Sequence, residues 1–408
     1  MELFKVMSVE DTKKLLVDTF KKKVHGEEIE LSDALGRIIY EDIKAKENVP
    51  AFRRSTVDGY AVASKDVVGA SETIPSMMNL IGEVIMGEAP CFSLKLSGEC
   101  VYVPTGGMLP EGADSMVMIE YTDKLDDETI LINTSIAYGE NVVDIGEDIA
   151  IDELIIKKGT KLRPYEIGVL SSLGIGKVSV FKRPKVAIIS TGDEIVGCDD
   201  TPKHGEVRDI NTYMLYAAVL EDGGYPVNFG VVKDDFSRLK TLMEKALEQC
   251  DVVLISGGSS VGKKDQSLRV LNSLDSSTVL VHGIAVKPGK PTIIGKVGEK
   301  AVFGLPGHPL SCAVVYKVIV KNYLNDLCCF DEKVYGIQCE FEMNYHKAKG
   351  REEYLPVIIK EENHNLIASP ILSKSGVITG FSKAWGYIKI EKNQEGILQG
   401  QRVYVYKF

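Results

Sequence analysis

The sequence predicts a multidomain protein that combines a doubly wound α/β domain with a β-rich insertion domain, a small helical and extended connecting domain, and a C-terminal β-barrel. Three observations support this fold class. The chain has 408 residues, more than one hydrophobic core of roughly 100–150 residues usually holds. Hydrophobic residues make up 44% and charged residues 26%, which is ordinary globular composition. Buried-strand and helical patterns alternate through residues 183–327.

The connecting domain is expected to be discontinuous, over residues 1–45 and 146–182. Its first part starts with a helix, because Ser8 and Asp11 form a capping-box-like start and apolar residues follow at helical spacing. The second part turns helical again near Arg163. Both parts are expected to pack beside each other.

Residues 46–145 are expected to form the β-rich insertion domain. They contain short β-rich stretches separated by turns such as Gly106-Gly107 and residues 109–112. Residues 328–408 alternate Tyr, Val and Ile with polar residues, and this pattern predicts the C-terminal β-barrel.

The α/β domain is placed at residues 183–327, where apolar strands and helical segments follow one another with short Gly-rich turns. The expected strands are 185–190, 227–232 and 251–256, and the expected helices are 212–220 and 237–248.

Composition excludes several classes of protein. A formal net charge of −10 argues against a broad nucleic-acid interface. No apolar run reaches the ~18 residues that cross a bilayer, and the N-terminus lacks the pattern of a signal peptide. The eight cysteines form no CxxC pair, which favours neither zinc nor a disulfide framework and predicts a cytoplasmic protein without nucleic-acid or membrane partners.

Four unusual loops are expected at strand ends, where ligands bind in open parallel sheets. They span residues 191–194, 256–265, 287–291 and 306–311. Any one of them alone is better explained as a tight connection, whereas four at one sheet edge predict a binding site.

The residues of these loops suit a phosphorylated ligand, an oxyanion and a hard cation. Gly257 and Gly258 would let backbone N–H groups approach a phosphate, and Lys287 and Lys290 would bind a compact oxyanion. Three acidic residues that follow strands would suit Mg²⁺; they are Glu194, Asp234 and Asp265. Neighbouring Asp235 is as well explained as a helix cap.

Ten short motifs occur in a specific order and spacing along the chain, at residues 55–61, 104–106, 109–114, 146–149, 163–164, 190–194, 209–211, 256–265, 287–291 and 306–309. In this order and spacing they resemble the molybdopterin molybdenumtransferases, the MoeA/gephyrin family. The resemblance implies an elongated homodimer with four structural domains per chain, of which residues 183–327 would be the molybdopterin-binding domain. It also implies an enzyme that inserts molybdate into adenylylated molybdopterin and releases AMP, with Mg²⁺ assisting.

The resemblance also implies roles for individual residues. The catalytic residues would be Asp58, Asp148 and Asp265. Substrate would be bound by Thr105, Glu194, Asp234, Gly257, Gly258, Ser260, Pro306 and Pro309. Molybdate would be bound by Lys287, Lys290, Pro291, Ser311, Arg351 and Ser375. The metal would be held by Glu194, Asp234 and Asp265. In the family, the lobe that carries Asp58, Thr105 and Asp148 faces the partner subunit's α/β domain.

Two departures from the family pattern occur: Val57 stands where the family often has Met, and His308 stands where it often has Asn. The match around Ser375 is loose. Asp58 is the candidate for orienting the attacking water. The alternatives are a tungstate-inserting paralogue and a non-enzymatic scaffold of the same family, and molybdate and tungstate have the same charge and nearly the same size.

Overall fold

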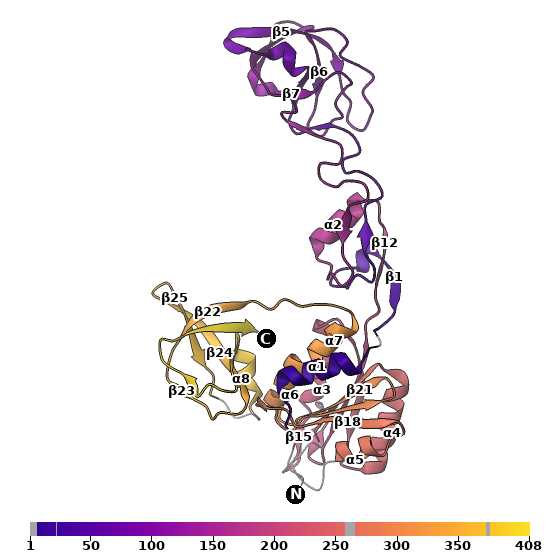
Figure 1. The fold of residues 1–408 in the computed structure, drawn as a ribbon, viewed down its shortest axis with the longest axis vertical. Helices are drawn as coiled ribbons and strands as arrows, with labels where there is room; N and C mark the ends of the chain where they lie inside the picture. The colour runs from indigo at the N-terminus through magenta and orange to yellow at the C-terminus, as the bar shows by residue number, and fades with distance from the viewer. Residues whose placement is uncertain (1–5, 22, 258–265, 373–375) are drawn as a thin grey trace.

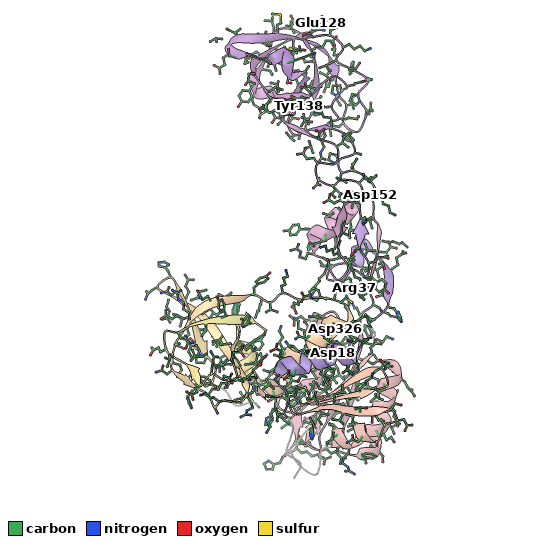
Figure 2. All side chains as sticks on the ribbon, in the orientation of Figure 1. Asp18, Arg37, Glu128, Tyr138, Asp152 and Asp326 are labelled. Carbon is green, nitrogen blue, oxygen red and sulfur yellow. The ribbon has the colours of Figure 1, made fainter. Side chains whose placement is uncertain are left out.

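The structure is a computed structural model that describes residues 6–21, 23–257, 266–372 and 376–408. The chain is elongated (Figure 1). The β5–β7 region lies at one end, the α/β layers lie at the other, and a small unit with α2, β1 and β12 lies between them. The C-terminal strands lie beside the α/β layers. Figure 2 shows the same division, with Tyr138 at the first end, Arg37 and Asp152 in the middle, and Asp18 and Asp326 by the α/β layers.

A six-stranded sheet forms the centre of the α/β region. Its order is β16 (Tyr225–Val232), β13 (Lys185–Thr191), β17 (Val252–Ser256), β21 (Lys300–Leu305), β20 (Ile293–Val297) and β18 (Ser277–His282). The first four strands are mutually parallel, and β20 is antiparallel to both of its neighbours. The carboxyl ends of the four parallel strands therefore meet at one edge of the sheet.

Helices cover both faces of this sheet. Successive residues of β13 point to opposite faces, so the strand contributes side chains to both cores. Val186 and Ile188 pack into one core and Ala187 and Ile189 into another. The first face is covered by α1 (Val9–Thr19), α3 (Asn211–Glu221), α6 (Pro309–Val315), the π-helical segment η4 (Tyr316–Val320) and α7 (Lys321–Leu327). The second face is covered by α4 (Phe236–Gln249) and α5 (Gln266–Asn272). The predicted doubly wound α/β domain is confirmed.

Helix α1 begins as the sequence predicts, with the Ser8 hydroxyl accepting a 3.0 Å hydrogen bond from the Asp11 backbone N–H. Its apolar face packs on the α/β core, where the Phe20 ring meets that of Tyr323 with 5.2 Å between centroids. Helix α1 therefore shares a core with the α/β layers, although its residues fall within the 1–45 range expected for the connecting domain.

The small middle unit is built from two distant parts of the chain. Strand β1 (Gly26–Glu30) pairs with β12 (Lys177–Phe181), and β2 (Ile43–Lys44) pairs with β11 (Leu154–Ile156). The helix α2 (Pro164–Ser172) and the turn η1 (Leu31–Asp33) complete the unit. Buried residues of both parts, including Ile39 and Leu170, form one core.

The insertion contains another six-stranded sheet. Its order is β7 (Ser115–Met118), β4 (Gly59–Val62), β6 (Glu99–Val103), β5 (Ser71–Glu83), β9 (Thr129–Thr134) and β8 (Thr122–Lys124). The turns η2 (Ser64–Val67) and η3 (Ile119–Tyr121) lie along it, and β3 (Arg54–Ser55) pairs with β10 (Val142–Val143) at its base.

The C-terminal strands close into a five-stranded barrel, as the sequence predicts. They follow the order β24 (Glu352–Glu362), β25 (Asn365–Pro370), β22 (Gly336–Phe341), β28 (Arg402–Lys407) and β26 (Gly386–Ile390), and β26 pairs back onto β24. The short strands β23 (Tyr345–His346) and β27 (Gly396–Ile397) and the helix α8 (Ile378–Lys383) complete this unit. Among the described helices, none is long and apolar enough to cross a membrane.

Candidate functional site

The ends of β13 and β16 bring two carboxylates together at the edge of the α/β sheet. The Thr191 hydroxyl donates a 2.8 Å hydrogen bond to Oδ1 of Asp234, whose backbone N–H donates to Oδ1 of Asp193 at 3.1 Å. Asp193 and Asp234 are both exposed. Asp234 thus presents its carboxylate to solvent where the sequence predicts a substrate and metal position.

Glu194 lies in the turn between β13 and the short strand β14 (Ile195–Val196), which pairs with β15 (Val207–Arg208). A Cβ added at Gly192 would lie 3.0 Å from Glu194 Oε2, so the carboxylate folds back over the end of β13. Within residues 6–21, 23–257, 266–372 and 376–408 no group of three His, Cys, Asp or Glu side chains is placed to hold a metal. Asp265, the third expected ligand, lies outside the described residues, as do Gly258 and Ser260. The assignment of Glu194 and Asp234 to a magnesium site stays a prediction, which rests on the preference of Mg²⁺ for carboxylate oxygens.

Asp235 is a helix cap, and its carboxylate accepts a 2.8 Å hydrogen bond from the Arg238 backbone N–H at the start of α4. This interaction stabilises the helix N-terminus. Asp234 and Asp235 are therefore adjacent carboxylates with different environments.

Gly257 serves a different purpose from the one predicted for its backbone. Its N–H donates to the Leu305 carbonyl at 3.2 Å, continuing the pairing of β17 with β21, and is not directed toward a ligand. Its φ is +99°, and an added Cβ would lie 2.0 Å from the Thr191 carbonyl oxygen. Only glycine permits this approach of two strand ends. The assignment of Gly257 to substrate binding stays a prediction. Because its N–H is already bonded to Leu305, a substrate would contact Gly257 through its Cα.

Beneath the edge, a buried polar network joins β13 to the start of α3. Asp209 Oδ1 accepts hydrogen bonds of 3.1 Å from the Ser190 hydroxyl and from the Thr212 backbone N–H. The Ser190 and Thr212 hydroxyls lie 2.8 Å apart.

Burial raises the pKa of the nearby Cys312 thiol to about 12, although a hydrogen bond with Ser256 opposes this shift, so Cys312 is neutral at physiological pH.

The loop at residues 287–291 does not follow a strand of the α/β sheet, contrary to the prediction of four loops at one sheet edge. It follows β19 (Val286–Lys287), which pairs in parallel with β24 of the barrel. The reason is that a two-residue strand can pair with any free edge nearby, and the barrel supplies that edge. Three of the four predicted loops follow parallel strands of the sheet, and the fourth belongs to the contact with the barrel.

This fourth loop nevertheless lies against α6. A Cβ added at Gly289 would lie 3.5 Å from the Ser311 backbone oxygen and 2.5 Å from the Val315 side chain. Ser311 is buried in the first turn of α6, which begins at Pro309, and Pro306 is buried before it. The carbonyl of Lys290 accepts from the backbone N–H groups of Ile284 and Thr292 at 3.0 and 2.9 Å. The loop that carries Lys290 and Pro291 therefore meets Ser311 through Gly289.

Arg351 approaches the same loop from the barrel. It is exposed and precedes Glu352, whose backbone N–H donates to the Ala285 carbonyl at 2.9 Å beside β19. Lys287 and Arg351 therefore come from neighbouring, hydrogen-bonded segments. Ser375, the remaining residue expected to bind molybdate, lies outside the described residues.

Sequence reasoning missed the residue that holds Lys287. Glu353, with a side chain only 5% exposed, lies 2.8 Å from the Lys287 ammonium, whose side chain is 46% exposed. The same Oε1 atom accepts a 2.7 Å hydrogen bond from the Tyr345 hydroxyl, while Oε2 is buried without a hydrogen-bond partner among the described residues. Burial and the bond to Glu353 raise the pKa of Tyr345, which keeps its hydroxyl a donor. The sequence signal was an acidic pair inside an apolar strand, Glu352-Glu353.

The insertion brings together two of its three predicted residues. Thr105 donates its backbone N–H to Asp58 Oδ1 at 2.8 Å, and both residues are exposed. Asp148 lies farther along the chain, where its backbone N–H donates to the Val49 carbonyl at 3.1 Å. The insertion sheet and the α/β sheet lie at opposite ends of the chain (Figure 1). One chain therefore does not unite Asp58 and Thr105 with the strand-end residues.

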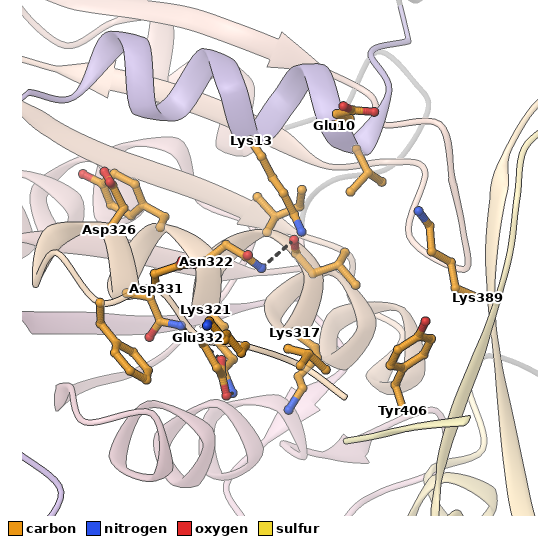
Figure 3. A pocket seen from close by; sticks show the side chains of 18 of the residues that line it. Glu10, Lys13, Lys317, Lys321, Asn322, Asp326, Asp331, Glu332, Lys389 and Tyr406 are labelled. Carbon is orange, nitrogen blue, oxygen red and sulfur yellow. Dashed lines mark hydrogen bonds and ion pairs between the residues drawn. The ribbon is translucent and has the colours of Figure 1, made fainter. Parts of the chain in front are cut away.

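A cavity of about 1040 Å³ lies elsewhere, between α1, the η4–α7 helix and the barrel. Lys13, Lys317 and Lys389 extend toward it from three different elements (Figure 3). Burial, together with the charge of Lys389, lowers the pKa of Lys13, while Glu352 opposes the shift. None of the residues predicted for the site is among the described residues that line this cavity.

Comparison with known proteins gives matches along nearly the whole chain. Residues 7–174 match the family described as "MoeA N-terminal region (domain I and II)", residues 187–326 match "Probable molybdopterin binding domain", and residues 339–408 match "MoeA C-terminal region (domain IV)".

Individual proteins match over the same length. A molybdopterin biosynthesis protein of Methanocaldococcus jannaschii is 35% identical over 94% of this chain and 92% of its own. The molybdopterin molybdenumtransferase of Bacillus subtilis is 29% identical over 95% of this chain and 90% of its own. A solved structure of the molybdopterin biosynthesis MoeA protein from Pyrococcus horikoshii, 30% identical, superposes with a TM-score of 0.87 and covers 99% of this chain and 100% of that one. The chain therefore belongs to the MoeA family of molybdopterin molybdenumtransferases, which are transferases of molybdenum cofactor biosynthesis.

Proposed function

We propose that this protein inserts molybdenum from molybdate into adenylylated molybdopterin and releases AMP. The observation that carries the proposal is the meeting of a Lys-rich loop with α6 beside the strand-end edge, where Gly289 and Ser311 adjoin. A dianion at this loop would be close to a ligand lying along the edge. Molybdate and the dithiolene of molybdopterin would then react as an effectively intramolecular pair.

The residues of the chain divide the work of binding. Lys287, Lys290 and Arg351 supply positive charge for the oxyanion, which is needed because the overall charge of −10 repels anions. The exposed Asp234 and Glu194 carboxylates would hold Mg²⁺ with Asp265. When bound, Mg²⁺ would neutralise charge on the pyrophosphate of the substrate.

The release of AMP requires cleavage of the phosphoanhydride. Water adds to a phosphorus atom, the bridging P–O bond breaks, and AMP departs with one phosphoryl group while the pterin keeps the other. Asp58 is placed to accept the water proton only if a second chain brings its insertion to the strand-end edge. We therefore propose a homodimer with two composite sites.

A surface for a second copy is available on α3. Tyr213, Tyr216 and Leu220 are 55%, 38% and 45% exposed and follow one another at helical spacing. A cytoplasmic location is proposed as well, since all eight cysteines are free.

The test is molybdate-dependent release of AMP from adenylylated molybdopterin by the purified protein. Replacing Lys290 with Ala should weaken molybdate binding by about tenfold or more, because a charge-assisted contact contributes about 1.5–3 kcal/mol. Isothermal titration with molybdate and with tungstate measures this and separates the two oxyanions. AMP release that does not depend on molybdate would refute the proposal. Strong preference for tungstate would favour the tungstate-inserting alternative, and absence of any AMP release would favour the scaffold.

A further inference from the structure

Asn211 is a buried residue that joins two strand ends. It is the first residue of α3 and is 7% exposed. Its Nδ2 group donates to the Ser256 hydroxyl at 2.6 Å and to the Gly307 carbonyl at 2.8 Å. Ser256 ends β17, and Gly307 follows β21. One amide therefore satisfies acceptors from two separate loops.

The two loops that Asn211 joins are loops in which substrate positions are predicted. Gly257 follows Ser256 directly, and Pro306 and Pro309 flank Gly307 and His308. The two glycine backbones adjoin, since a Cβ added at Gly307 would lie 3.5 Å from Gly257 Cα. Glycines carry no side chain with which to fix their own positions. Their spacing therefore depends on the backbone bond from Gly257 to Leu305, on a 3.4 Å hydrogen bond from the Ser267 hydroxyl to the Gly257 carbonyl, and on the two hydrogen bonds from Asn211.

The start of α3 is itself held firmly. Asp209 accepts hydrogen bonds from Ser190 and from the Thr212 backbone, which ties the helix to the end of β13. Three strand ends, those of β13, β17 and β21, are thus connected through residues 209–212. The two hydrogen bonds from Asn211 therefore fix Ser256 and Gly307 relative to the start of α3.

The other side of the Asn211 amide shows that packing alone does not explain this residue. Its Oδ1 atom is buried and has no hydrogen-bond partner among the described residues. A buried carbonyl left unpaired costs stability. An apolar residue of similar size would avoid that cost but would lose both N–H donors. Asn211 therefore retains the two hydrogen bonds that connect the loops, at the cost of an unpaired carbonyl.

We propose that Asn211 is a positioning residue of the substrate site, which sets the separation of the Gly257 and Gly307 backbones for the nucleotide part of the substrate. This inference rests on the proposed function. It predicts that losing the amide weakens nucleotide binding and leaves oxyanion binding intact, because the two hydrogen bonds of the amide go to Ser256 and Gly307 and not to the loop that carries Lys287 and Lys290. Misplacement of binding groups by a fraction of an ångström commonly costs about tenfold or more.

The experiment compares Asn211→Ala with the matched control Asn272→Ala, an exposed residue at the end of α5. AMP and molybdate are titrated separately by calorimetry, and KM and kcat are measured with adenylylated molybdopterin. The inference expects AMP affinity to fall about tenfold, KM to rise more than kcat falls, molybdate affinity to stay within about twofold, and the control to match the unmutated protein.

Unchanged AMP affinity in Asn211→Ala overturns the inference, and so does an equal loss of AMP and molybdate binding, which would indicate general loosening. If Asn211→Ala does not fold, Ser256→Ala removes one of the two acceptors and should show a smaller loss confined to AMP. If the unmutated protein binds no AMP, the proposed nucleotide site fails, and the positioning role fails with it. Normal AMP affinity in the variant alone would leave the proposed function standing.

Discussion

The carboxylate of Asp58 accepts a 2.8 Å hydrogen bond from the backbone N–H of Thr105, although both residues are exposed to solvent. One carboxylate oxygen is thus fixed by the loop after β6, and the other accepts no hydrogen bond from the part of the chain that the structure describes. Asp58→Asn keeps an acceptor for Thr105 but removes the charge. We expect AMP release to fall by roughly a hundredfold or more if Asp58 takes the water proton, while thermal unfolding stays unchanged. If Asp58→Asn releases AMP as fast as the unmutated protein, Asp58 serves only to hold the loop of Thr105 through its hydrogen bond.

Assembly of the site from two chains predicts complementation. Asp58→Ala and Asp265→Ala chains should each be inactive as homodimers. A purified heterodimer, made by co-expression with two affinity tags, should recover about half of the unmutated activity, because one of its two composite sites carries neither lesion. A heterodimer without AMP release would mean that Asp58 acts within its own chain or has no catalytic role.

The ion pair between Lys287 and Glu353 predicts that Lys287 contributes to stability. Lys287→Ala leaves the buried Glu353 carboxylate with Tyr345 as its hydrogen-bond partner, which should cost about 1–3 kcal/mol. Adding Glu353→Gln to this variant should recover part of the loss, because the uncompensated charge is removed. Urea unfolding of the single and double variants measures both effects. No recovery in the double variant would contradict the account.

The contact between Gly257 and Thr191 predicts a strong effect of a single methyl group. Gly257→Ala places a Cβ 2.0 Å from a carbonyl oxygen at a φ of +99°, and should lower the unfolding free energy by at least about 2 kcal/mol. Gly307→Ala is the matched control, since its Cβ would meet the Gly257 Cα at an ordinary 3.5 Å. Denaturation showing equal stability of the two variants would contradict the close approach.

The lowered pKa of Lys13 predicts that the effect of replacing this residue on protein stability depends on pH. Burial and the charge of Lys389 lower its pKa in the folded protein below the ordinary 10.5. At a pH below the folded pKa both folded and unfolded states carry the proton, so the folded state bears the full cost of the buried charge. As the pH rises through the folded pKa, the folded state loses the proton first and the cost disappears.

Lys13→Met should therefore stabilise the protein at pH 7 by on the order of 0.5 kcal/mol, with the gain shrinking as the pH approaches 10.5. Lys14→Met, an exposed neighbour, is the control. The difference in unfolding midpoint between each variant and the unmutated protein is measured from pH 7 to pH 10.5. A gain that grows with pH would contradict the sign of this effect.

The features that depend on short-range chemistry were predictable from the sequence. The alternation of apolar runs located β13, β16 and β17 within two residues of their observed ends. Ser8 capped α1 as its spacing to Asp11 predicts, and the alternative reading of Asp235 as a cap proved correct. The family motifs located Asp58 and Thr105, which the structure joins. Periodicity and capping act over a few residues, so these features are written directly in the chain.

The surfaces that those elements share with one another depend on the complete fold and were not predictable from local patterns. Helix α1 packs with Tyr323 rather than with the strands that follow it, β19 pairs with the barrel rather than with the sheet, and Glu353 holds Lys287. Asn211 meets Ser256 and Gly307, which lie 45 and 96 residues away in sequence. Such contacts arise because a buried face or a free strand edge pairs with whatever complementary surface the whole fold brings near it, and no local pattern encodes that choice.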